Sequence, residues 1–501
     1  MNQIDQSILT LILLLPLAGA VLVALTPDRF KLPNWIALLT TLATFGLTLH
    51  LPAHFDKTQS GFQFEINRLW IERPAIFYHV GVDGLSLWLV VLVGLLAPIG
   101  VVASWNAIRE RRKLFFTLFL IQQTAMFGVF LSLDLMIYYG FWELSLAPMA
   151  ILIAMYGRKN GPKAALKFFL FTFIPSAPLL VAILWLYTQT GSFDFTTLQI
   201  LIAHGNFPAG ALFWAALAFL FAFAVKVPVF PLHGWVADTF SEAPVALAMV
   251  VAGKLGLYSM LRFHIGLFPE QAHRNAPWIM ILALIGIIYG ALVSLVQPNL
   301  KKLIAYSSIS HLGFVVLGIF SFTAAGLNGA VFIMLAHGVA TGGLFMLAGI
   351  LYERRHTYEI TEFGGLATPM PKYATFFLFT VLASLGLPLL NGFIGEFLVL
   401  SGAFQARPIY GILAATGVIW SACYLLWMYQ RVFFGEMKHN INGALPDLNL
   451  REKAALSPIA VAALVMGVAP LVWLSAIDPA VQRYALAPFT QLAGRMVGLG
   501  Q

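Results

Sequence analysis

Apolar runs of about 18 residues or more recur along the whole chain, and each is long enough to cross a bilayer as a helix. The runs are continuous and do not alternate apolar with polar residues, which excludes a transmembrane β-barrel. Only 10% of the 501 residues are charged, whereas a soluble chain of this length carries roughly 25%. We therefore predict an all-α polytopic membrane protein.

The apolar runs divide into about fourteen transmembrane helices, and an even number places both termini on the same side of the membrane. The first run follows "MNQIDQS", which carries Asp5 and no basic residue, so we expect a retained helix and not a signal peptide. The predicted spans are 8–25, 33–51, 83–106, 114–133, 134–156, 166–189, 210–230, 244–263, 277–296, 302–321, 327–351, 373–402, 409–434 and 456–475.

The distribution of basic residues predicts the orientation. Loops after odd-numbered spans hold 19 of the 29 Lys and Arg residues, and loops after even-numbered spans hold six. Basic loops stay on the cytoplasmic side, so we expect both termini on the outer, periplasmic side. The net charge of +8 is thus explained by topology, and we expect a lipid bilayer and no nucleic acid as partner.

Two spans carry sequences that break a helix. The seventh contains "KVPVFPLHG", where Pro228 and Pro231 lack backbone donors, and the twelfth contains "LGLPLLNGFIGEF", where we expect Pro388, Gly392 and Gly395 to loosen the helix. Paired broken helices in two halves are typical of transporters built from repeats. The offset of five helices predicts two inverted five-helix repeats. The predicted division is 1–113 (helices 1–3 with an external loop), 114–263 (first repeat), 277–434 (second repeat) and 435–501 (a loop and helix 14).

Six titratable residues are predicted deep inside apolar spans, where each must be hydrated or paired. Residues of this kind facing the interior of a helix bundle indicate a path for protons or ions. Burial shifts lysine and glutamate toward their neutral forms and a neighbour of opposite charge restores ionisation, which favours protons. A Na⁺ site would need more clustered oxygen ligands. The six residues are Glu143, Lys226, Lys254, His311, His337 and Glu396.

The break after Lys226 suggests how these residues work. Pro228 is expected to free carbonyls near Ala224, which water or polar side chains must satisfy. Water admitted there would also solvate Lys226. Glu143 beside Lys226 would hold the lysine charged, and separation of the pair would release a proton. His233 lies seven residues beyond Lys226 and is a possible relay, with a purely structural role the alternative.

The chain offers no redox, metal or nucleotide site of its own. Its single cysteine, Cys423, excludes an internal disulfide and a cluster held only by cysteines. No glycine-rich nucleotide loop follows a predicted strand. The energy for transport must therefore come from partner subunits.

Eight stretches in order along nearly the whole chain resemble the antiporter-like subunits of respiratory complex I (NADH-quinone oxidoreductase), most closely those of the subunit M type. They are "GVDGLSLWLVVL", "FWELSLAPM", "KFFLFT", "KVPVFPLHGWVAD", "EAP", "KLGLYSMLRF", "LKKLIAYSSISHLGFVVLGI" and "GFIGEF".

The resemblance implies fourteen helices, two inverted repeats, broken helices 7 and 12, and a proton-translocating role driven by quinone reduction elsewhere. It implies FMN, iron–sulfur clusters and quinone in partner subunits, other membrane-arm subunits and a peripheral redox arm as partners, and a bacterial inner membrane as location. It places the family's buried acids, lysines and histidines on the same six residues, Glu143 to Glu396.

Two positions distinguish this chain within the family. Glu396 stands where subunit L proteins carry lysine, which favours the subunit M type. Phe240 in "ADTF" stands where the family has a histidine, so one polar contact between helices 7 and 8 is in question. Three alternatives stay open: a subunit of an Mrp-type cation/proton antiporter, a proton-handling subunit of a hydrogenase or CO₂-uptake complex, and an intramembrane transferase using Glu143 and the histidines.

Overall fold

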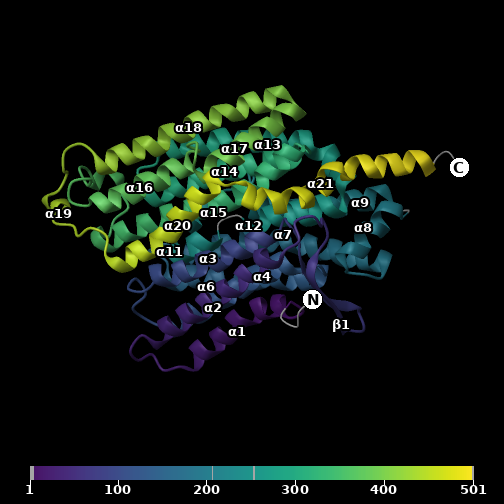
Figure 1. Ribbon diagram of the computed structural model, residues 1–501, viewed down its shortest axis with the longest axis horizontal. Helices are drawn as coiled ribbons and strands as arrows, with labels where there is room; N and C mark the ends of the chain where they lie inside the picture. Colours follow the sequence, from purple (N-terminus) through teal and green to yellow (C-terminus); the bar gives the residue numbers. More distant parts are fainter. Residues whose placement is uncertain (1–4, 206, 252–253, 499–501) are drawn as a thin grey trace.

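The computed structural model describes residues 5–205, 207–251 and 254–498, and most of them are helical (Figure 1). The helices run along the long axis of the molecule. Their bounds are α1 (Ile8–Leu25), α2 (Leu32–His54), α3 (Leu87–Ala103), α4 (Arg112–Leu131), α5 (Leu135–Leu144), α6 (Leu146–Tyr156), α7 (Gly161–Thr190), α8 (Phe195–His204), α9 (Ala209–Lys226), α10 (Val236–Glu242), α11 (Val245–Val251), α12 (Lys254–Ser259), α13 (Pro269–Val296), α14 (Leu300–Phe320), α15 (Ala324–Arg355), α16 (Pro371–Ser384), α17 (Asn391–Ala406), α18 (Pro408–Phe433), α19 (Asn440–Gly443), α20 (Leu450–Val468) and α21 (Leu471–Gly498).

The all-α polytopic architecture is confirmed. Within the described part of the chain, eleven helices are long and apolar enough to cross a membrane, or twelve if the bent pair α20–α21 is one span. The α3 helix, at 17 residues, and the α16–α17 pair fall below that length criterion. The predicted count of fourteen therefore stays a prediction.

The centre of the bundle is formed by α14 and α15, which are buried along 94% and 100% of their most apolar windows. The α15 sequence "HGVATGG" supplies small residues, which let neighbouring helices approach closely inside a membrane. His311 on α14 and His337 on α15 are therefore held in the interior by the packing of both helices.

Both predicted breaks are present. The first lies between α9, which ends at Lys226, and α10; the second is the segment 385–390 between α16 and α17. Of the three residues expected to form the second break, Pro388 lies within it, and Gly386 joins it in place of the other two. Gly386 has φ +77°, a conformation open to glycine, whereas Gly392 and Gly395 lie inside α17 and allow close packing. A Cβ on Gly395 would be 3.0 Å from the Ile333 nitrogen of α15.

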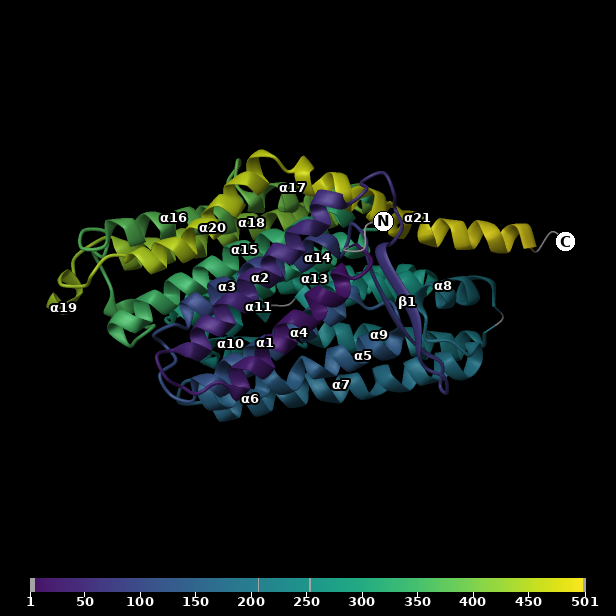
Figure 2. The same ribbon diagram turned by 60° about the horizontal axis from the view of Figure 1, so that its bottom comes forward.

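The predicted last span, 456–475, is wrong as one straight helix. The chain turns at Ala469 and Pro470, and α21 continues at 68° to α20. Proline at this point removes a backbone donor from the helix ladder. Figure 2 shows α21 leaving the bundle, at the end that also carries α8. The C-terminal unit thus contains a second long helix besides helix 14.

The loop between α2 and α3 contains an antiparallel hairpin, β1 (Gln63–Ile71) and β2 (Ile76–Val82), which was not predicted from the sequence (Figure 2). The hairpin is anchored to helices distant in sequence. Asp134, which caps α5, accepts a hydrogen bond from the Phe77 nitrogen at 3.0 Å. Buried His79 contacts Asp194, the cap of α8, and its Nε2 lies 2.8 Å from Glu65 Oε1.

The contacts of His79 predict that the stability of the β1–β2 hairpin depends on pH. Burial alone lowers the pKa of His79, but hydrogen bonds with Asp194 and Glu65 and their charges outweigh burial and raise the pKa above its usual value. The stabilisation is therefore complete below about pH 6.5, the unfolded value, and is lost as pH rises through the raised pKa. Hydrogen-exchange protection factors of hairpin amides should fall over that range. His79→Gln should abolish this dependence, and an unchanged pH dependence in that variant contradicts the assignment.

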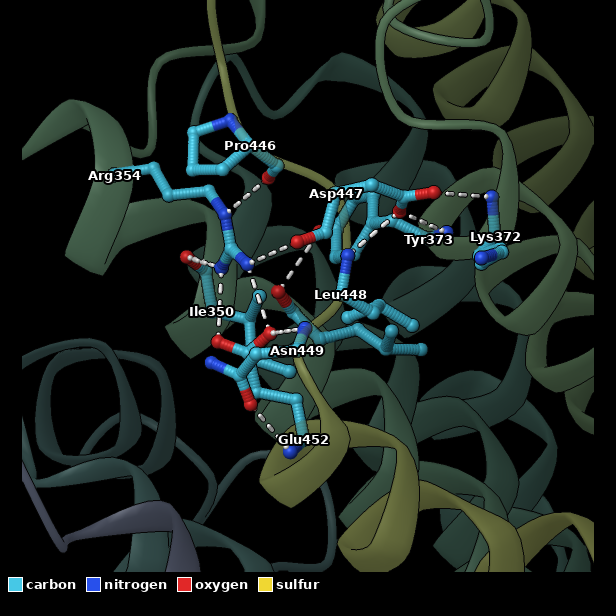
Figure 3. A network of polar contacts seen from close by, with 10 residues as sticks. Ile350, Arg354, Lys372, Tyr373, Pro446, Asp447, Leu448, Asn449 and Glu452 are labelled. Carbon is cyan, nitrogen blue, oxygen red and sulfur yellow. Dashed lines mark hydrogen bonds and ion pairs between the residues drawn. The ribbon is translucent and has the colours of Figure 1, made fainter.

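The opposite end is held by a polar network around Arg354, in the last turn of α15 (Figure 3). Its guanidinium binds both carboxylate oxygens of Glu452 on α20, at 3.1 and 2.8 Å. Glu452 also closes a capping box with Asn449. Asp447 accepts hydrogen bonds from the backbone nitrogens of Lys372 and Tyr373, at the start of α16. Three helix ends are thereby tied together.

Candidate proton path

Lys226 is the last residue of α9, and the backbone at the break is satisfied by the protein itself. The Val229 nitrogen donates to the Ala224 carbonyl at 2.8 Å, and the Trp235 indole donates to the Val225 carbonyl at 2.9 Å. The expectation that water or polar side chains satisfy the carbonyls around Ala224 is confirmed at Val225, where the Trp235 indole is the donor. The Ala224 carbonyl instead accepts from a backbone nitrogen, because the chain turns sharply enough to return one.

The Lys226 ammonium is buried, with 6% of the residue exposed. Its Nζ donates to the Ser145 hydroxyl at 2.9 Å and lies 4.2 Å from the centre of the Trp142 ring, a favourable cation–π distance. Glu143 lies next to both contact residues at the junction of α5 and α6, and its Oε1 is buried with no hydrogen-bond partner among the described residues. Glu143 therefore lies at the α5–α6 junction, which contacts the end of α9 through Ser145, and it forms no ion pair with Lys226 within 4.0 Å.

A cavity of about 10 Å³ adjoins Lys226, close to the smallest space that holds a water molecule. Phe240, where the resemblance noted above implies a histidine, lines this cavity and packs near Trp235, with ring centres 6.2 Å apart. The polar contact that this substitution puts in question would therefore lie near Lys226.

Lys254 opens α12 and is 1% exposed. No group in the described part of the chain hydrogen-bonds to its Nζ. Its Cε packs against α15 so closely that a Cβ on Gly338 would lie 2.7 Å away. Gly256, two residues further on, lies against the backbone of Lys226, so the two lysines belong to segments in direct contact. The helix then widens to a π-helix, Met260–Ile265, a feature frequent at functional sites.

The second half brings His311, His337 and Glu396 together. His311 Nδ1 lies 3.2 Å from Glu396 Oε1, and its Nε2 lies 3.3 Å from the Tyr424 hydroxyl. The two histidine rings are 5.9 Å apart, and neither His337 nitrogen has a partner among the described residues. A cavity of about 20 Å³ is lined by these three titratable residues and Ser384, which is room for one water molecule.

His233 does not join either group. Because α9 ends at Lys226, the chain does not continue as a helix and the two residues do not share a face. The His233 ring packs on Phe230 and Tyr289, with ring centres 5.4 and 4.9 Å away. Its role as a relay stays a prediction.

Several polar residues at the site were not found from the sequence. Ser145 holds Lys226 and Tyr424 contacts His311, but neither carries a charge that marks it within an apolar span. A third group, Gln122, Gln123 and Thr124, is buried in the middle of α4. The run "QQT" inside a span of apolar residues is the sequence signal that could have revealed this group.

Comparisons with known proteins identify the family of this chain. Residues 132–421 match the family described as "NADH:quinone oxidoreductase/Mrp antiporter, TM". NADH-quinone oxidoreductase subunit M of Rhodobacter capsulatus is 40% identical over 493 residues, which cover 95% of this chain and 96% of the relative. The chain belongs to the subunit M family. The resemblance to this family noted in the sequence is thereby confirmed.

Solved structures give the same fold for this member of the subunit M family. A chain of respiratory complex I from Thermus thermophilus matches with a TM-score of 0.88 and 33% identity, covering 96% of this chain and 99% of that one. The Mrp complex from a Dietzia species matches with a TM-score of 0.83, 98% coverage of this chain and 99% of the other, and 20% identity. At that identity the second match shows the fold alone.

Within the described ranges, no group of three or more His, Cys, Asp or Glu side chains is placed to hold a metal ion. The candidate residues lie in three places: Glu143 and Lys226 near the first break, Lys254 on α12, and His337, His311 and Glu396 near the second break. Groups of this kind exchange protons stepwise when water bridges the gaps between them.

Proposed function

We propose that this chain is a proton-translocating membrane-arm subunit of NADH-quinone oxidoreductase, and that Glu143, Lys226, Lys254, His337, His311 and Glu396 carry the proton. One observation supports this most strongly. Lys254 and His337 are buried, and their side-chain nitrogens have no hydrogen-bond partner among the described residues. They lie between the two helix breaks, the first of which holds Lys226 and the second the His311–Glu396 pair. Buried groups of this kind are costly in a membrane and are kept for transport.

In the proposed sequence of events, a displacement of Glu143 relative to Lys226 changes the charge balance at the first break. Lys226 then gives up its proton toward Lys254, and the proton leaves through His337, His311 and Glu396 to the outer side. Neither contact of the Lys226 ammonium, the Ser145 hydroxyl or the Trp142 ring, carries a net charge. The position of the Glu143 carboxylate therefore decides whether Lys226 stays protonated.

The energy comes from outside the chain. Moving one charge across the membrane costs about 2.3 kcal/mol per 100 mV, or on the order of 3.5 kcal/mol at roughly 150 mV. Quinone reduction in partner subunits, which would hold FMN and iron–sulfur clusters, supplies this energy. The chain lies in a bacterial inner membrane with both termini on the outer side.

The first experiment is to purify the tagged chain from gently solubilised native membranes and to identify its companions. Flavin and iron–sulfur subunits, together with NADH-driven quinone reduction in the eluate, are the expected result. If only other antiporter-like subunits accompany the chain, the redox assignment is wrong and a cation/proton exchanger takes its place.

A further inference from the structure

Three consecutive polar side chains in the middle of α4 have no hydrogen-bond partner within the described structure. Gln122 and Gln123 are each 1% exposed and Thr124 is 2% exposed. Both amide atoms of each glutamine and the Thr124 hydroxyl are unsatisfied. Buried polar groups are nearly always hydrogen-bonded, to protein or to ordered water. The proposed proton path uses none of the three.

Thr124 faces the junction of α5 and α6, where Ser145 lies. The α4 helix runs antiparallel to α5 and α6, because the Phe115 ring contacts Tyr156, 5.1 Å away, and Gly128 lies against the Phe141 ring. Thr124 is one turn before Gly128, on the same face. Ser145 is one turn beyond Phe141, so Thr124 lies at the level of Ser145 and the Lys226 ammonium that it binds.

Gln123 faces the segment that holds Lys254. It shares one face of α4 with Phe119, four residues before it, and with Phe130, seven residues after it. Phe119 meets Ala246 where both pack against Gly100, and the Phe130 ring lies 5.1 Å from Tyr258. Lys254 lies between Ala246 and Tyr258 in the chain. Because side chains in a helix point back toward the N-terminus of that helix, the Lys254 side chain reaches the level of Gln123.

We propose that Gln123 and Thr124 form a buried water-binding site that connects the Ser145–Lys226 pair to Lys254. This inference rests on the proposed function. The Gln123 amide offers donors and an acceptor, and the Thr124 hydroxyl offers one donor and an acceptor. The site can therefore fix the orientation of bound water molecules. A proton leaves the Lys226 ammonium as an N–H bond breaks, each water accepts one proton and passes on another, and an N–H bond forms on neutral Lys254. The two side chains are positioning residues and do not themselves ionise.

The direct test is a high-resolution cryo-EM map of the unmodified, assembled complex. Water density within hydrogen-bond distance of the Gln123 amide and the Thr124 hydroxyl is expected. A dry site in a map that resolves water elsewhere in the membrane arm overturns the inference, and this result depends on no variant.

The functional test is the double variant Gln123→Leu/Thr124→Val in the whole complex. NADH-driven proton translocation should fall to the level of Lys254→Met at an unchanged yield of complex, and Thr124→Ser, which keeps the hydroxyl, should retain translocation. Thr117→Val, on the same helix but facing the Ala20 carbonyl, is the matched control and should have no effect. If Lys254→Met lowers translocation and the double variant does not, this inference is wrong and the proposed function stands. If Lys254→Met itself has no effect, the proposed function is wrong.

Discussion

Lys226→Ala is expected to slow proton transfer through this chain by about 10²-fold or more, the usual contribution of a positioned proton donor. The complex should still assemble. Lys226 makes a single hydrogen bond, to Ser145, and no ion pair within the described structure, so no buried opposite charge is left unpaired at ion-pair distance. NADH-driven acidification of inverted membrane vesicles measures the effect, with the amount of assembled complex quantified on native gels.

Two variants separate charge from packing at this position. Lys226→Met keeps the length of the side chain and should be as defective as Lys226→Ala. Ser145→Ala keeps the ammonium but removes its anchor, and should have a smaller effect. An unchanged proton-to-electron ratio in Lys226→Ala would remove Lys226 from the path.

Asp83→Ala is expected to have the largest effect on stability, about 3–5 kcal/mol, because it leaves the Arg262 guanidinium buried without its counter-charge. Arg262 is 1% exposed and Asp83 is 2% exposed, and the two form an ion pair. Arg262 Nη1 also donates to the Tyr484 hydroxyl at 2.7 Å. The pair joins the start of α3 to the π-helix that follows Lys254 and to α21. A lower thermal midpoint and a lower yield of complex measure the loss.

The double variant Asp83→Ala/Arg262→Met is the matched control. Removing both charges removes the uncompensated guanidinium, and a buried pair replaced by apolar groups is often neutral. The double variant should therefore recover much of the stability lost in Asp83→Ala. Equal losses in both would show that the ion pair is not the cause.

The helical spans were predictable because an apolar run in lipid must satisfy its own backbone as a helix. The hairpin of β1 and β2 was not. Two strands alone are marginally stable, and this pair is anchored by Asp134 and Asp194, contacts that depend on the tertiary arrangement. The bend at Pro470 was also missed, because hydropathy continues across it while the helix does not.

The charged members of the site were predictable from the cost of burying them, whereas their neutral partners were not. Lys226, Lys254 and Glu396 stand out in apolar sequence. Ser145 and Tyr424 do not, since hydroxyls are tolerated inside many helices. The satisfaction of the Ala224 carbonyl by the Val229 nitrogen depends on the fold of the break itself, which a count of prolines does not reveal.

The central claim is that one row of buried groups carries the translocated proton, and Lys254 is the link between its two halves. The decisive measurement is the number of protons translocated per electron by the whole complex in proteoliposomes, for the unmodified chain and for Lys254→Met, with exposed Lys372→Met as the control. The account predicts a lower ratio in Lys254→Met and an unchanged ratio in the control. A ratio in Lys254→Met equal to that of the unmodified complex, at equal rates of quinone reduction, would contradict it.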